Sequence, residues 1–265
     1  MCYYRGLTIT NNDTLKLSDF KLLLTGIENQ QVIDGFAYGS TPVVVSDKSG
    51  GYTFEQMEWG FIPHYLNNRE AVEKFRRGYT DDKGKYHPGL TTLNAIGEEM
   101  LQPGKMYRSA ALGRRCLFMS TQFYEWRHIH PIGKRGLPLK TAVKYPYAIR
   151  TKNDSHLHLI AGIWQPWTDK ETGETVNTCS LITTKANPLM QQIHNTKKRM
   201  PCILTEALAV EWLSNVLSEE RVTEIASFQM PAGDMEAWPI HKDFKTAECP
   251  TEPMAYNELP PLENV

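Results

Sequence analysis

The feature that most constrains the fold is a series of short segments rich in β-branched and aromatic residues, which is typical of β-strands. Polar, glycine-bearing or proline-bearing stretches separate them, notably 47–51, 130–139 and 168–177. These connections are too short for helical crossovers, so we expect a mainly antiparallel sheet. The expected strands are Thr41–Ser46, Tyr52–Phe61, Arg115–Trp126, Tyr145–Thr151, His156–Trp164, Thr178–Thr184 and Pro201–Leu204.

Helices are expected at few places, where a capping side chain precedes an apolar pattern. They run from Asn67 or Asn68 through Val72 and Phe75 to Gly78, from Thr205 to Leu213, and from Ser218 through Ile225. The glycine-rich, charged stretch Gly78–Leu90 is expected to be a surface loop. Together these patterns predict an α+β fold, a single domain in which a curved, barrel-like, mainly antiparallel sheet carries peripheral helices.

The C-terminal end differs in composition from the rest of the chain. Residues 246–265 hold four Glu and four Pro but no Lys or Arg, which predicts a loosely packed or disordered tail behind one domain over residues 1–245. The formal net charge of the whole chain is −1. Total charge therefore does not indicate nucleic-acid binding, and local clusters of cations would have to attract an anionic partner.

The five cysteines are odd in number and widely spaced, without a Cys-x-x-Cys pair. This pattern favours neither a disulfide framework nor a zinc knuckle. Cys116, Cys179 and Cys202 lie in apolar strand-like runs and are expected in the core. The sequence has no apolar run long enough to span a bilayer and its first residues lack a secretory pattern, so we expect a cytoplasmic protein.

Cys2 follows only the initiator Met1, so removal of one residue would leave an N-terminal cysteine with an amine and a thiol on neighbouring carbons. The amine can condense with an aldehyde to a Schiff base, and the thiolate can then close a thiazolidine ring. Reference pKa values of about 8 for the amine and about 8.5 for the thiol leave both partly reactive near neutrality. Cys2 alone does not distinguish this chemistry from an accident of the N-terminus.

Several segments in a fixed order add information. They are Met1-Cys2; Trp59-Gly60-Phe61-Ile62-Pro63; Thr91-Thr92-Leu93-Asn94-Ala95 with Glu98; Arg115-Cys116-Leu117 leading to Phe123-Tyr124-Glu125-Trp126; Leu181-Ile182-Thr183-Thr184-Lys185-Ala186-Asn187; and Ile193-His194 with Arg199-Met200-Pro201. Each is weak alone. In this order they resemble the SOS-response-associated peptidase (SRAP) family of abasic-site-processing proteins.

The resemblance implies a covalent thiazolidine between Cys2 and the ring-opened aldehyde of an abasic site in single-stranded DNA, which shields the lesion. It implies that Asn94 positions the N-terminus and the sugar, that Glu125 moves protons, and that His194 protonates the ring oxygen or orients the aldehyde. These roles need no metal or cofactor. Slow strand cleavage by a lyase reaction and self-removal of Met1 are further implied activities, and a monomer is expected.

The resemblance also implies DNA contacts. Trp59, Pro63 and Tyr65 resemble an aromatic and proline-bearing wedge beside the strand, where base stacking is worth about 1–3 kcal/mol per base; core packing explains them equally well. Arg5 and Arg199 are expected to contact phosphates. Thr184, within one of the matching segments, belongs to the same expected DNA-binding set.

The chain departs from the family pattern at three places that bear on DNA binding. Ile96 stands where the family has an arginine, and three extra residues precede Arg199. The extra segment carries Lys197 and Lys198, which could replace the lost phosphate contact. The basic residue near the start is also shifted by one position, to Arg5.

Three other interpretations remain open. An N-terminal cysteine also serves amidohydrolases in which the α-amine is the base and the thiol attacks an amide; a glutaminase assay would separate the two. A single-strand-binding module without chemistry would bind DNA independently of Cys2. The pairs His128-x-His130 and His156-x-His158 each place two imidazoles on one strand face, as in a metal site, but no acidic or cysteine partner stands at ligand spacing.

Overall fold

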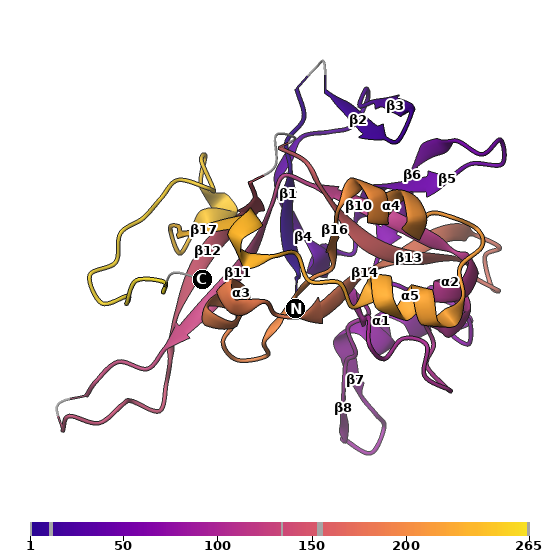
Figure 1. Cartoon of the computed structure of the whole chain (residues 1–265). Coiled ribbons are helices and arrows are strands. Elements are labelled where there is room, and N and C mark those ends of the chain that lie inside the picture. The colour runs from indigo at the N-terminus through magenta and orange to yellow at the C-terminus, as the bar shows by residue number, and fades with distance from the viewer. Residues whose placement is uncertain (1, 11–12, 134, 153–155, 264–265) are drawn as a thin grey trace.

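A closed ring of five strands forms the centre of the protein (Figure 1). The computed structural model describes residues 2–10, 13–133, 135–152 and 156–263. The ring consists of β5 (Ser40–Ser46), β6 (Tyr52–Trp59), β10 (Arg115–Ser120), β13 (His158–Thr168) and β14 (Thr175–Lys185). Neighbouring strands are antiparallel except β14 and β6, which are parallel. The predicted barrel-like, mainly antiparallel sheet is confirmed.

Three short strands extend the barrel and a second sheet packs beside it. The extensions are β9 (Asn94–Ile96) and β15 (Arg199–Pro201), both on β14, and β16 (Ile203–Leu204) on β13. The second sheet has the order β17 (Met235–Pro239), β12 (Val143–Thr151), β11 (Gln122–Ile129), β1 (Tyr4–Leu7) and β4 (Gln30–Asp34). A separate hairpin pairs β2 (Thr14–Leu17) with β3 (Phe20–Leu23).

The segment Arg115–Trp126 was expected to be one strand, but the structure divides it between the two sheets. The break lies at Thr121, after β10 has paired inside the barrel and before β11 pairs with β1 and β12. The Ser120 hydroxyl lies 2.7 Å from the Gln122 carbonyl oxygen and 3.0 Å from that of Gly6, which holds the bend. The chain therefore passes from the barrel directly into the sheet that carries Glu125.

The expected helices are confirmed together with their caps. α1 (Arg69–Arg77), α4 (Glu206–Trp212) and α5 (Glu219–Ala226) begin where the side chains of Asn68, Thr205 and Ser218 accept hydrogen bonds from backbone amides. Two further helices, α2 (Arg108–Gly113) and α3 (Pro188–Ile193), were not expected, because six residues show little helical periodicity. Short 3₁₀ turns are η1 (Gly35–Ala37), η2 (Ala232–Asp234) and η3 (Phe244–Thr246).

Two expectations about irregular segments are wrong. Gly78–Leu90 is not a plain loop but contains the hairpin β7 (Gly78–Thr80) and β8 (Tyr86–Pro88), in which the rings of Tyr79 and His87 stack at 4.8 Å. The tail is not loose over residues 246–263. Its Pro253 forms a β-bridge with Ile240, and the Tyr145 hydroxyl donates to Glu258 at 2.9 Å. Three apolar side chains of the tail, those of Tyr256, Leu259 and Leu262, pack on the core. These contacts hold the tail against the domain although its composition is polar.

The core fills the barrel and the space between the two sheets. Cys116, Cys179 and Cys202 are completely buried and free, as predicted. No helix within the described residues is long and apolar enough to cross a membrane.

Candidate active site

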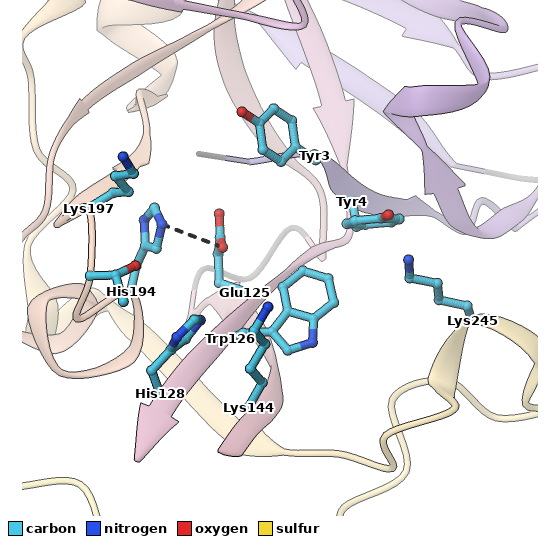
Figure 2. Close-up of a pocket in the computed structure, with 10 residues that line it drawn as sticks. Tyr3, Tyr4, Glu125, Trp126, His128, Lys144, His194, Lys197 and Lys245 are labelled. Carbon is cyan, nitrogen blue, oxygen red and sulfur yellow. Dashed lines mark ion pairs between the residues drawn. The ribbon is translucent and has the colours of Figure 1, made fainter. Parts of the chain in front are cut away.

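A cavity of about 400 Å³ opens where the N-terminal strand meets β11 (Figure 2). Tyr4 on β1 lies opposite Tyr124 on β11, and this register brings the chain start beside Glu125. The cavity is lined by Tyr3, Tyr4, Glu125, Trp126, His128, Lys144, His194, Thr196, Lys197 and Lys245. Strands of the second sheet, the turn after α3 and the C-terminal segment thus meet at one place.

The Glu125 carboxyl is only 4% exposed, and burial raises its pKa to about 7. His194, at the end of α3, places Nε2 4.0 Å from Glu125 Oε2. Burial lowers the pKa of His194 to about 4, so the imidazole is neutral near pH 7. Its Nδ1 lies 2.8 Å from the Arg199 carbonyl oxygen, which can only accept, and 3.3 Å from the Arg199 amide nitrogen, which can only donate, and the shorter contact favours a proton on Nδ1. With this tautomer, Nε2 directs a lone pair toward the Glu125 carboxyl, whose pKa is close to neutral.

Cys2 lies at the same junction but inside the core. Its side chain is completely buried in a cluster with Trp59 and Leu93, and its thiol donates to the Tyr4 carbonyl oxygen at 3.7 Å. Burial and then the charge of Glu125 raise the pKa of the thiol to about 12. The sulfur is therefore protonated in this arrangement and needs a base before it can act as a nucleophile.

Asn94 stands on β9, whose residues pair with β14 of the barrel. Both its side-chain oxygen and nitrogen are buried and have no hydrogen-bond partner in the described part of the chain. A buried amide group left unpaired costs about 1–3 kcal/mol, so such a group in a native fold calls for an explanation, of which a bound ligand is one. Asn94 is not among the described residues that line the cavity, although the preceding Leu93 packs in the same cluster as Cys2.

The expected phosphate contact of Arg5 is wrong. Its guanidinium is completely buried and donates to the Met119 carbonyl oxygen and the Thr41 hydroxyl. It also lies 5.5 Å from the Trp59 ring centroid and 5.4 Å from that of Phe118. The Arg5 guanidinium joins the N-terminal strand to the barrel. Because it is buried there, it stabilises the fold and is not presented to DNA.

The expected wedge does not form around Glu125 either. Trp59 is 1% exposed and its indole donates to the Leu93 carbonyl oxygen at 3.0 Å, so core packing is the correct interpretation. Pro63 is buried as well. Tyr65 is 54% exposed but lines another cavity, with His64 and Arg114.

Thr184 and Arg199 face inward and pair with Glu98. The Thr184 side chain is completely buried, and its hydroxyl lies 3.2 Å from Glu98 and 3.1 Å from the Ser227 carbonyl oxygen. Arg199 donates to Glu98 Oε2 at 2.7 Å and to the Thr183 carbonyl oxygen at 2.6 Å. The expected DNA contact of Thr184 is wrong in this structure because its side chain is covered. Arg199 is neutralised by a carboxylate but is not fully covered, so its expected phosphate contact stays a prediction.

Sequence reasoning singled out Lys197 as a replacement phosphate contact but missed Lys144, Lys245 and the aromatic rings around the cavity. Tyr3 and Tyr4 follow Cys2 in the sequence, and Trp126 follows Glu125. Their closeness to predicted site residues could have identified these aromatic rings. Lys144 and Lys245 carry no local signal, because they come from β12 and η3. Lys245 Nζ lies 3.8 Å from the Tyr4 ring centroid, a cation–π contact that only the fold creates.

The paired histidines do not assemble a site that could hold a metal. His156 pairs with Asp13 at 3.0 Å, whereas His158 is buried on β13. Within residues 2–10, 13–133, 135–152 and 156–263, no group of three His, Cys, Asp or Glu side chains is arranged to bind one.

Residues 30–247 match the family described as SOS response associated peptidase (SRAP). The chain belongs to the SRAP family. Among its SRAP relatives is the abasic site processing protein YobE of Bacillus subtilis, 32% identical over 185 residues, which are 70% of this chain and 69% of YobE. The abasic site processing protein HMCES of Xenopus tropicalis is 27% identical over 163 residues, or 59% of this chain and 44% of HMCES.

Two solved crystal structures of other proteins have a fold similar to that of this SRAP chain. A protein of Bacteroides thetaiotaomicron superposes with a TM-score of 0.72 at 27% identity, covering 95% of this chain and 97% of that one. A second crystal structure, of a Bordetella bronchiseptica protein, has a TM-score of 0.60 at 19% identity and covers 82% and 90% of the two chains.

Proposed function

We propose that this SRAP-family chain processes abasic sites in single-stranded DNA by a covalent crosslink through Cys2, once Met1 has been removed. The observation that carries the proposal is the buried Glu125 carboxyl, with its pKa near 7, facing a neutral His194 beside the N-terminal strand. The names of YobE and HMCES, both abasic site processing proteins, support the choice of substrate. Met1 lies outside the described residues.

The proposed reaction needs one group that first donates a proton and later takes one back. The free amine of Cys2 would add to the C1′ aldehyde of the ring-opened sugar to give a carbinolamine. Glu125 in its acid form would protonate the hydroxyl, which leaves as water, and an iminium forms. The Glu125 carboxylate would then take the thiol proton while sulfur attacks the iminium carbon, closing the thiazolidine. Aldehyde and aminothiol give thiazolidine plus one water, and Glu125 ends as it began.

Burial of Cys2 fixes the order of these steps. Because the thiol pKa is raised to about 12, little thiolate exists before the amine has reacted. The amine therefore attacks first, and the carboxylate made by loss of water is the base that releases the sulfur. His194 Nε2 would orient the Glu125 carboxyl by accepting a hydrogen bond from its proton, or would accept a proton from the sugar, because its lone pair faces the carboxyl.

Asn94 is proposed to hold the substrate. Its carboxamide offers a donor and an acceptor that no other described residue uses, and these match a sugar hydroxyl or the freed amine. Slow strand cleavage by elimination from the iminium, and removal of Met1 by the protein itself, are secondary proposed activities.

Intact-protein mass spectrometry under denaturing conditions tests the proposal. The protein is incubated with single-stranded DNA that contains one abasic site, and with the undamaged strand as a control. The wild type is expected to lose Met1 and to gain the DNA mass less one water, whereas Cys2→Ser gives no stable adduct. Absence of an adduct from wild type that has lost Met1 contradicts the mechanism, and a glutaminase assay would then test amide hydrolysis.

A further inference from the structure

Three lysines surround the cavity, and they come from three separate segments. Lys144 lies on β12, Lys197 in the turn between α3 and β15, and Lys245 in η3. Figure 2 shows them on different sides of Glu125. All three are exposed, and none forms an ion pair with a carboxylate of the described residues. Their charge is therefore available to an incoming anion.

The charge balance of the lining favours an anion. Glu125 is the only acidic residue among the described residues that line the cavity, and its burial keeps much of it protonated at neutrality. Lys74 and Lys105 are, by contrast, neutralised by carboxylates: Lys74 pairs with Glu70 at 2.6 Å and Lys105 with Glu99 at 2.9 Å. The rim of this cavity is thus a local cluster of cations on a chain with almost no net charge.

The fold holds each lysine in place through its neighbours. Lys245 lies over the Tyr4 ring, and the preceding Phe244 is buried and stacks on Tyr124 at 4.6 Å. Lys144 stands opposite His128 in the β11–β12 register. Because the backbone at these positions is already fixed, binding a ligand does not require the segments themselves to become ordered.

The turn that carries Lys197 is tied to the same strand. The side chain of Asn195 accepts from the His128 amide at 3.0 Å and donates to the His128 carbonyl oxygen at 2.8 Å. The three extra residues before Arg199 therefore form a fixed turn, with Lys197 on the cavity and Lys198 outside its lining.

We propose that Lys144, Lys197 and Lys245 clamp the strand around the nucleotide that sits over Glu125, with each lysine neutralising one phosphodiester. This inference rests on the proposed function, because it assigns the strand-binding residues of the same site. It also explains how the chain can bind DNA although Ile96 replaces the family arginine, Arg5 is buried and Arg199 is paired with a carboxylate. Lys245 makes the segment just before the C-terminal tail part of the binding site.

Salt dependence of binding measures the number of phosphate contacts directly. The probe is fluorescent single-stranded DNA with one tetrahydrofuran abasic analogue, which has no aldehyde and forms no adduct, titrated at several salt concentrations. For single strands, the slope of log K against log salt is about −0.7 per phosphate neutralised. Each Lys→Gln change is expected to reduce the magnitude of the slope by about 0.7, and the triple change by about 2.

A matched control changes three exposed lysines outside the cavity lining, Lys48, Lys83 and Lys170, to Gln. This control is expected to keep the wild-type slope, and changing the three rim lysines to Arg is expected to restore it. Thermal unfolding shows whether the variants fold. An unchanged slope in the folded rim variant, or an equal reduction in the control, would overturn the clamp.

The two proposals fail separately. If the wild type forms the adduct but the rim variant keeps the wild-type slope, the crosslink through Cys2 is supported and the lysine clamp is contradicted. If the slope is reduced but the wild type forms no adduct, the lysine clamp is supported and the crosslink is contradicted.

Discussion

Two carboxylates lie on either side of the segment that runs from His194 to Arg199, and they are in opposite chemical states. Glu98 lies 2.7 Å from the Arg199 guanidinium, whereas Glu125 faces a neutral imidazole at 4.0 Å. Burial works against the charge of Glu98 and is the largest single influence, but the hydrogen bond and charge of Arg199 together with backbone hydrogen bonds outweigh it and lower the pKa. Burial of Glu125 raises its pKa to about 7. The partner, not the burial alone, decides whether a carboxylate stabilises the fold or can carry a proton.

The largest expected effect separates the two groups by rate. Glu125→Gln is expected to slow adduct formation by about 10²–10⁴-fold, the usual contribution of a general acid or base. Glu98→Gln is expected to leave the rate per folded molecule near that of the wild type. Single-turnover assays on denaturing gels measure both. Equal losses in the two variants would mean that Glu98 also handles protons.

The stability of the protein should respond to Glu125 with a defined sign. Its folded pKa of about 7 lies above the ordinary value of 4.5 for a glutamate, so the protonated form stabilises the fold below pH 4.5 and that stability is lost as pH rises through 7. Glu125→Gln removes the penalty and is expected to raise the free energy of unfolding by about 3 kcal/mol at pH 8. Urea unfolding at pH 4 and pH 8 checks this. A gain of the same size at both values would exclude titration as the cause.

Breaking the other pair should cost stability instead. Arg199→Met leaves Glu98 without its cation in a partly buried position, and is expected to lower the free energy of unfolding by about 2 kcal/mol. Urea denaturation of this variant is compared with the double variant that also carries Glu98→Gln. The second change should recover part of the loss, and no recovery would argue that Arg199 acts through packing alone.

The smallest effect is on the pH profile of adduct formation. The reaction needs a neutral amine, whose usual pKa is about 8, and a protonated Glu125, whose pKa is about 7, so the rate should be nearly level between about pH 7 and pH 8 and fall by about tenfold per pH unit above about pH 8. Glu125→Gln should abolish this limb, whereas Glu98→Gln should keep it. Rates measured between pH 6 and pH 9 are sufficient. An alkaline limb that survives in Glu125→Gln would assign the proton to another group.

Local rules were enough to determine part of the fold from the sequence. Strand composition predicted β5 and β12, and the caps Asn68, Thr205 and Ser218 placed three helices, because a capping side chain bonds amides only two or three residues away. The ordered segments also pointed to the SRAP family, which the match over residues 30–247 bears out.

Only the tertiary structure decided which cations face the cavity. Arg5 reaches Met119, 114 residues along the chain, and such a contact leaves no trace in the neighbouring sequence. Lys245 contacts the Tyr4 ring across an even longer separation in sequence. It lies just before residues 246–265, whose composition predicted a loosely packed tail. A basic residue looks equally exposed wherever it stands in a sequence. Burial and partners fix its role, and these are set by how the sheets pack.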